Sequence, residues 1–129
     1  MFIINIFMSQ NSIFKKDSYN FAKDIVFLYK HLTVSKHEYV LSKQLLRSGT
    51  SIAANIHEAI GSQTRKDFFS KISISYKEAL ETEFWLELVK DCDYIDLVEF
   101  NYLNSKLVPI LKMLSATKLT VQKSLIKVS

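Results

Sequence analysis

Hydrophobic residues recur every three or four positions along most of the chain, which is the period of an amphipathic α-helix. Phe21, Ile25, Leu28 and Leu32 follow this spacing in the first such segment. The same period recurs in three further segments, so the predicted helices span about residues 17–32, 36–60, 65–90 and 97–116. Four amphipathic helices with short connections predict an all-α, antiparallel up-down four-helix bundle.

Polar residues indicate where these helices begin. Ser35 and Glu38 have the spacing of a capping box, so the second helix is expected to start there. Thr64 and Asp96 are the expected N-terminal caps of the third and fourth helices. Gly61 fits the position just after the end of the second helix, where glycine often stops a helix.

The two ends of the chain fit the bundle less well than its middle. Pro109 removes a backbone hydrogen bond, so it should kink or interrupt the fourth helix. We therefore expect a bundle domain over residues 17–115, and a basic tail or frayed helix end over residues 116–129. Residues 1–16 are expected to form a loosely held N-terminal extension, of which residues 1–7 would be an upstream arm preceding an ordinary start at Met8.

We expect neither a membrane-spanning segment nor a framework of disulfide bonds. The apolar run from Met1 to Met8 is too short to cross a bilayer and lacks the basic flank of a signal peptide. Cys92 is the single cysteine, so no intrachain disulfide can form, and a cytoplasmic location is the simplest expectation.

Catalytic and metal motifs are not found. His57 and Glu58 begin like a zinc-protease helix, but the second histidine would have to stand where the chain has Gly61. Cys92 lies between two aspartates, whose charges disfavour a thiolate. We predict no catalytic residues, no metal, no cofactor and hence no enzymatic activity.

Charge is distributed unevenly along the chain. The net charge is +4, yet residues 78–99 contain eight acidic residues and one basic residue. The simplest interpretation is that this acidic helix pairs with basic neighbours, and a separate binding patch is the alternative.

The stretch "RSGTSIAANIHEA", residues 47–59, combines two helix faces. At about 100° per residue, Gly49, Ile52 and Ile56 fall on a core face. Small and polar residues fall on the opposite side, where they could let another subunit approach closely. The candidate oligomer interface consists of Arg47, Ser51, Ala54, Asn55 and Glu58, and a solvent-exposed stripe without a partner is the alternative.

Basic residues line the outer faces of the first two helices. Three lysines of the first helix are seven residues apart and therefore nearly aligned. The candidate nucleic-acid-binding residues are Lys16, Lys23, Lys30, Lys36, Lys43 and Arg47. We expect no aromatic residues interleaved with them, and hence sequence-independent phosphate contacts at most.

Several motifs between about residues 39 and 95 resemble those of the 23S rRNA-intervening sequence protein family. They are "QLLRS" at 44–48, Ser51-Ile52 with Asn55 and Glu58, Asp67-Phe68 with Lys71, Glu78-Ala79 with Glu81-Thr82, Trp85-Leu86, and the "DYI" turn at 93–95. The resemblance implies a four-helix bundle that assembles into a ring-shaped homo-oligomer, a homopentamer, with a poorly defined role. A related branch resembles the accessory proteins of diversity-generating retroelements, which are basic rings that engage nucleic acid.

Two functions follow as hypotheses. The first is a non-enzymatic oligomeric accessory protein that binds RNA or DNA without sequence specificity. The alternative is a scaffold that binds another protein, with the basic faces serving only solubility.

Overall fold

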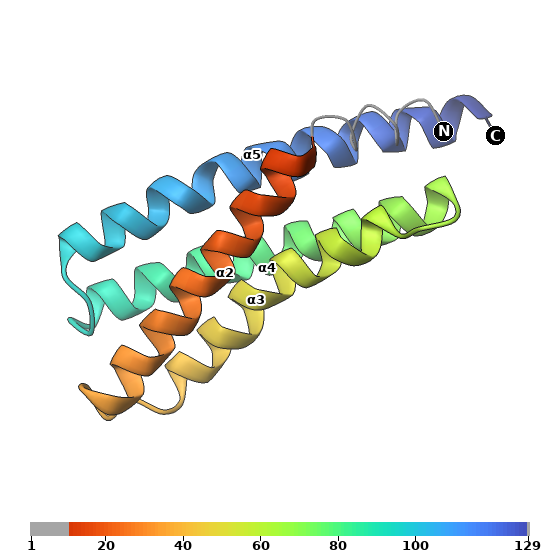
Figure 1. Ribbon diagram of the computed structural model, residues 1–129. Helices are drawn as coiled ribbons and strands as arrows, with labels where there is room; N and C mark the ends of the chain where they lie inside the picture. The colour runs from red at the N-terminus through yellow and green to blue at the C-terminus, as the bar shows by residue number, and fades with distance from the viewer. Residues whose placement is uncertain (1–10, 129) are drawn as a thin grey trace.

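The computed structural model describes the backbone of residues 11–128 and the side chains of residues 14–126, and within that range it contains helices and no strand. The helices are α2 (Asn11–Val34), α3 (Leu41–Ile60), α4 (Arg65–Asp91) and α5 (Leu97–Val128). They form the predicted four-helix bundle (Figure 1).

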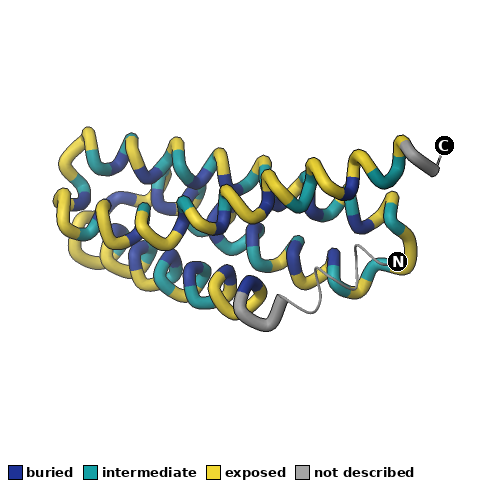
Figure 2. Tube along the Cα trace, turned by 90° about the horizontal axis from the view of Figure 1, so that it is seen from above, coloured by how far each residue is buried: buried dark blue, intermediate teal, exposed yellow. Residues whose placement is uncertain are grey.

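Each helix packs against the next one in the sequence, and α2 also contacts α5. Figure 1 shows α3, α4 and α5 running roughly alongside one another, while α2 crosses them obliquely. Buried positions follow the inner side of the helices and exposed positions the outer side (Figure 2). The predicted core residues of the first helix, Phe21, Ile25, Leu28 and Leu32, are all buried.

The expected caps of the last two helices are confirmed. The backbone N–H of Asp67 donates to Thr64 Oγ1 over 3.0 Å. The backbone N–H of Glu99 donates to Asp96 Oδ1 over 2.8 Å. Each bond satisfies one of the donors that the first turn of a helix leaves without an intrahelical partner.

The predicted start of the second helix is wrong. α3 begins at Leu41, and the residue that caps it is Glu38, whose carboxylate accepts the N–H groups of Val40, Leu41 and Ser42 over 3.1, 2.9 and 2.7 Å. His37 has a φ of 54°, which is incompatible with helix, so Ser35 cannot act as the cap. Burial raises the pKa of Glu38, but the three N–H donors outweigh it and hold the pKa below the ordinary value of 4.5.

Gly61 does follow the end of α3, but it does so without the left-handed conformation that favours glycine. Its φ is −83°. A Cβ added there would meet only the carbonyl oxygen of Glu58, at 3.7 Å. The glycine is therefore not required by the backbone at this turn.

α5 differs from the expectation in two ways. It continues without interruption through Pro109, and it extends to Val128 instead of fraying after Ala116. Val121 is buried in the core, and Arg65 Nη1 donates to Ser124 Oγ over 3.0 Å, so packing against α4 explains the extra length. The region after 116 thus belongs to the bundle.

The bundle also begins earlier than residue 17. α2 starts at Asn11, and Phe14 is buried in the core. The expectation for residues 1–7 concerns a segment outside the described residues. Among the described helices, none combines the length and the apolar character that a bilayer crossing requires.

Buried hydroxyl groups join α3 to α4. Thr82 Oγ1 and Ser48 Oγ lie 2.9 Å apart, and Ser75 Oγ donates to the carbonyl oxygen of Ile52 over 2.9 Å. All three hydroxyl residues are fully buried. Small side chains here let the two helices approach closely, and their hydrogen bonds remove the penalty of burying polar atoms.

A glycine sets the approach of α2 to α3. A Cβ on Gly49 would lie 2.8 Å from both Cγ1 and Cγ2 of Ile25, closer than non-bonded carbons pack. The predicted core role of Gly49 is confirmed, since the residue is buried. Ile25 occupies the space that a side chain at position 49 would need.

Candidate nucleic-acid interface

The outer face of α2 carries three lysines with two aromatic rings between them. Taking Lys23 as reference, Lys16 and Lys30 lie about 20° to either side around the helix, and Tyr19 and Phe27 about 40° to either side. We call these five residues the α2 stripe. From Lys16 to Lys30 it extends about 21 Å along the helix.

The two aromatic residues of the α2 stripe are open to solvent. Tyr19 is 60% exposed and Phe27 is 62% exposed. Lys23 Nζ lies 5.5 Å from the centre of the Tyr19 ring, and Lys30 Nζ lies 5.9 Å from the centre of the Phe27 ring. The expectation that no aromatic residues interleave with these lysines is therefore wrong. The signal is present in the sequence, because helical spacing places residues 19 and 27 between the lysines.

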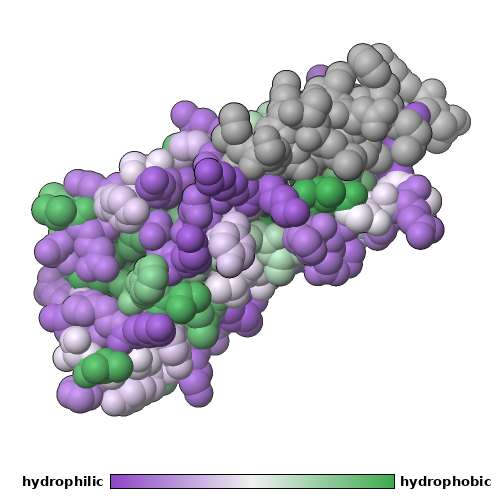
Figure 3. Space-filling view, viewed as in Figure 1, coloured by the Kyte–Doolittle hydropathy of each residue, from purple (hydrophilic) through white to green (hydrophobic). Residues whose placement is uncertain are grey.

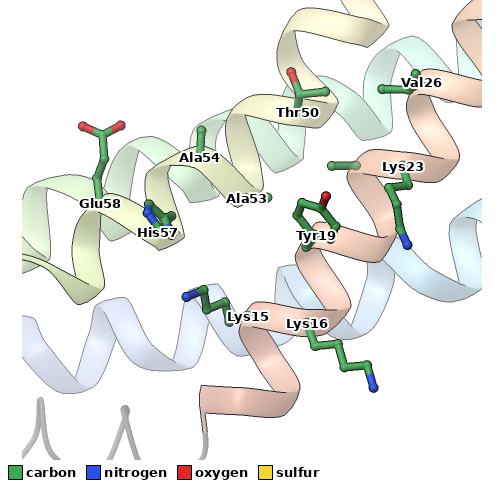
Figure 4. A pocket seen from close by; sticks show the side chains of 11 residues that line it. Lys15, Lys16, Tyr19, Lys23, Val26, Thr50, Ala53, Ala54, His57 and Glu58 are labelled. Carbon is green, nitrogen blue, oxygen red and sulfur yellow. The ribbon is translucent and has the colours of Figure 1, made fainter.

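A groove adjoins the α2 stripe where α2 diverges from α3 (Figure 4). It has a volume of about 870 Å³, and its walls are mainly apolar. From α2 it is lined by Lys15, Lys16, Tyr19, Ala22, Lys23 and Val26, and from α3 by Thr50, Ala53, Ala54, His57 and Glu58. In Figure 4 the Tyr19 ring points from α2 toward α3, whereas Lys16 and Lys23 point away from the gap.

α2 packs along α3, with a close approach where Gly49 meets Ile25, and the oblique course of α2 separates the two helices toward its N-terminal end. On the face seen in Figure 3, hydrophilic and hydrophobic side chains alternate over short distances. Hydrophilic groups and apolar contact area thus lie close together on this face.

The remaining candidate phosphate-binding residues are separate from the α2 stripe. Lys36 is exposed in the connection between α2 and α3, and Lys43 is exposed on α3. Arg47 instead faces α4, where its guanidinium donates to Glu78 Oε2 over 3.0 Å and also to Glu81 Oε2. Two carboxylates compensate its charge, which leaves the three α2 lysines as the more available cations.

The candidate interface residues of α3 do not share one environment. Ser51 and Asn55 bond to backbone carbonyls of their own helix, to Arg47 O over 2.6 Å and to Ser51 O over 2.8 Å. Glu58 Oε1 lies 3.2 Å from Lys71 Nζ of α4. Ala54 is exposed and lines the groove. The polar and charged residues of this set thus have bonding partners within the chain. Of the five, only Ala54 presents a small apolar side chain at the surface.

The acidic helix α4 presents both ion-paired carboxylates and exposed apolar side chains. Glu78 and Glu81 pair with Arg47, in line with the expected pairing of an acidic helix with a basic neighbour. The same helix, α4, exposes Ile74, Leu80 and Phe84. Its outer face is therefore apolar and acidic, in contrast to the basic and aromatic α2 stripe.

Residues with metal-binding or nucleophilic side chains are dispersed. No group of three or more His, Cys, Asp or Glu residues is placed to hold a metal ion within the part of the chain that the structure describes. His57 lies on the groove, and Cys92 is exposed at the end of α4. The arrangement offers cations, aromatic rings and apolar surface, which are groups for binding.

The model of the family described as 23S rRNA-intervening sequence protein matches residues 10–116. The chain belongs to this family. The match includes α2 from its start, which the motif resemblance placed outside the strongest region, and most of α5.

A similar solved structure supports the fold. It is the crystal structure of a protein with unknown function from the S23 ribosomal protein family of Bacteroides thetaiotaomicron VPI-5482. That protein is 47% identical over 83% of this chain and 96% of its own, with a TM-score of 0.80. The search of curated proteins found no match. The family and fold are thus shown, while the family description itself assigns no activity.

Proposed function

We propose that this 23S rRNA-intervening sequence protein is a non-enzymatic accessory protein that binds RNA or DNA through phosphate contacts. The observation that carries the proposal is the alignment of Lys16, Lys23 and Lys30 on one exposed helix face. Lysines about 10 Å apart along a helix can contact several phosphates of one nucleic acid, and such contacts supply most sequence-independent affinity.

The experiment is a titration of labelled RNA and duplex DNA at low and moderate salt. The triple variant K16A/K23A/K30A should bind more weakly and show a shallower dependence of affinity on salt, by about two to three in the log–log slope. The matched control is K106A/K112A/K123A, which removes the same charge from exposed positions of α5. Absence of binding by the wild type at low salt, or equal losses in both triple variants, would refute the proposal.

Assembly into a ring-shaped homo-oligomer, a pentamer, is part of the same proposal. It is supported by exposed apolar side chains on α4, at Ile74, Leu80 and Phe84, together with the low surface at Ala54 on α3. Two different patches on one chain suit head-to-tail contacts, which form rings when the rotation closes. A ring would repeat the α2 stripe around its circumference and multiply weak phosphate contacts.

Light scattering tests the assembly independently of nucleic acid. The mass should be about five times the 15.0 kDa of one chain. Ala54→Glu and Phe84→Glu introduce a charge at each proposed patch, and each should lower the mass while the helical circular dichroism stays constant. A wild-type monomer at micromolar concentration would exclude the ring.

A protein scaffold is the second candidate, and the exposed apolar side chains within the acidic stretch of α4 favour it. A partner protein would use that face in place of a second subunit. Co-purification from the native host separates the two functions. A protein partner that remains bound after nuclease treatment, and is lost with Phe84→Glu, supports the scaffold.

A further inference from the structure

We propose that the α2 stripe prefers single-stranded nucleic acid over duplex, because Tyr19 and Phe27 stack on unpaired bases while the lysines beside them hold the phosphates. This inference rests on the proposed nucleic-acid binding and names the class of ligand. The juxtaposition that carries it is a pair of exposed aromatic rings placed alternately with three aligned lysines.

The exposure of these two rings is not explained by the packing of the chain. Tyr19 and Phe27 belong to the outer face of α2, and more than half of each side chain lies open to solvent. A large aromatic surface in water is unfavourable, and covering it with the flat face of a base would remove that cost. The outer face of α2 is thus apolar at two sites where a helix facing plain water would carry polar residues.

The order of the groups along α2 matches the alternation of a nucleic-acid strand. Each ring has a lysine three or four residues away on either side, and in each case one ammonium group lies within 6 Å of the ring centre. Phosphates and bases also alternate along a single strand. A strand running along α2 could therefore place phosphates at Lys16, Lys23 and Lys30 and bases at the two rings between them.

The groove beside Tyr19 adds apolar space for a base that leaves the stack. Ala22, Val26 and Ala53 contribute small or apolar side chains to its walls, and Tyr19 points into it. Bases in a duplex are already stacked and paired, so they cannot use either ring without being extruded. A duplex would contact only the lysines, which is why the preference should favour a single strand.

The test compares a labelled single-stranded RNA with a duplex RNA of the same length, using fluorescence anisotropy and the full chain. The double variant Y19L/F27L keeps apolar side chains but removes both rings. It should lose single-strand affinity by about five-fold or more for each ring and leave duplex affinity nearly unchanged. The variant Y19F/F27Y keeps both rings and should bind like the wild type.

Tyr102→Leu is the matched control. Tyr102 is a half-exposed tyrosine of α5 with Lys106 Nζ 5.5 Å from its ring centre, so it resembles the stripe residues without belonging to them. It should leave both affinities unchanged. Equal wild-type affinity for the two RNAs, or equal losses in Y19L/F27L and Tyr102→Leu, would overturn the stacking inference while phosphate binding stands. Binding of neither RNA would overturn both proposals.

Discussion

Gly49→Ala tests the close crossing of α2 and α3. A methyl group at this position would lie 2.8 Å from two carbons of the buried Ile25 side chain and 3.2 Å from its Cβ. Replacing glycine by alanine inside a helix should by itself stabilise the protein by about 1 kcal/mol. Overpacking a close-packed site costs about 1–3 kcal/mol. The balance predicts a loss of about 1 kcal/mol in the free energy of unfolding.

Gly61→Ala is the matched control, because its added Cβ would meet only one backbone oxygen at 3.7 Å and the φ of −83° suits any residue. This substitution should raise the free energy of unfolding by about 0.4–1 kcal/mol. The two variants should therefore differ by about 1.5–2 kcal/mol in urea unfolding followed by circular dichroism. All variants are compared at one protein concentration, since assembly couples stability to concentration.

A double-mutant cycle identifies the contact that causes the loss. Ile25→Ala removes the two carbons that lie 2.8 Å from the new methyl group and leaves only the Cβ, at 3.2 Å. In that background Gly49→Ala should become stabilising, because the helix-propensity gain remains and the added methyl fills part of the cavity. If Gly49→Ala is as stabilising as Gly61→Ala in the wild-type background, the glycine does not set the distance between the helices.

Three further tests concern the capping of α3, the surface pairing of Arg47 and the end of α5. The pKa of Glu38 is lowered on folding, so its stabilising effect is present above its unfolded value of 4.5 and is lost as the pH falls through the lower folded value. The wild type should therefore exceed E38Q in unfolding free energy by about 1 kcal/mol near neutral pH. This difference should shrink below pH 4.5. A pH-independent difference would contradict the capping role. Arg47→Met breaks ion pairs between partly exposed side chains and should cost less than about 1 kcal/mol in urea unfolding, with a loss of several times that value counting against a surface role. Val121→Asp places a carboxylate at a position that is 1% exposed and should lower the free energy of unfolding by about 3 kcal/mol. Leu119→Asp, on the exposed side of α5, should change it by about 0.5 kcal/mol or less. Equal effects of the two substitutions would mean that this end of α5 is not packed.

The sequence predicts the helices well because their periodicity directly reports burial. Phe21, Ile25 and Leu32 follow helical spacing, and all three are buried. Local chemistry at a helix start is predictable when the cap is one side chain and one N–H, as at Thr64. The predicted start of α3 is wrong for a local reason. A capping box assumes a continuous helical backbone after Ser35, and the left-handed conformation of His37 interrupts that backbone.

At the C-terminal end of the chain, tertiary packing explains why α5 is longer than the sequence predicts. Pro109 carries a local penalty, yet α5 continues past it because burial of Val121 and contacts with α4 stabilise the segment beyond. Angular positions on one helix also cannot reveal the neighbouring helix. Arg47 and Glu58 lie on the side of α3 that faces solvent in such a projection, but their long side chains reach carboxylate and ammonium groups on α4.

The character of the candidate interface depends on the oblique course of α2. α2 packs along α3 most closely where Gly49 meets Ile25, and the two helices diverge toward the N-terminal end of α2. Divergence leaves the side of α2 around Tyr19 uncovered by the other described helices, so the ring lies between the groove and the lysines. A more parallel α2 would bury this part of the face against α3. It follows that Gly49→Ala, by pushing the helices apart where they pack most closely, should weaken single-strand binding even though the residue is buried and outside the α2 stripe.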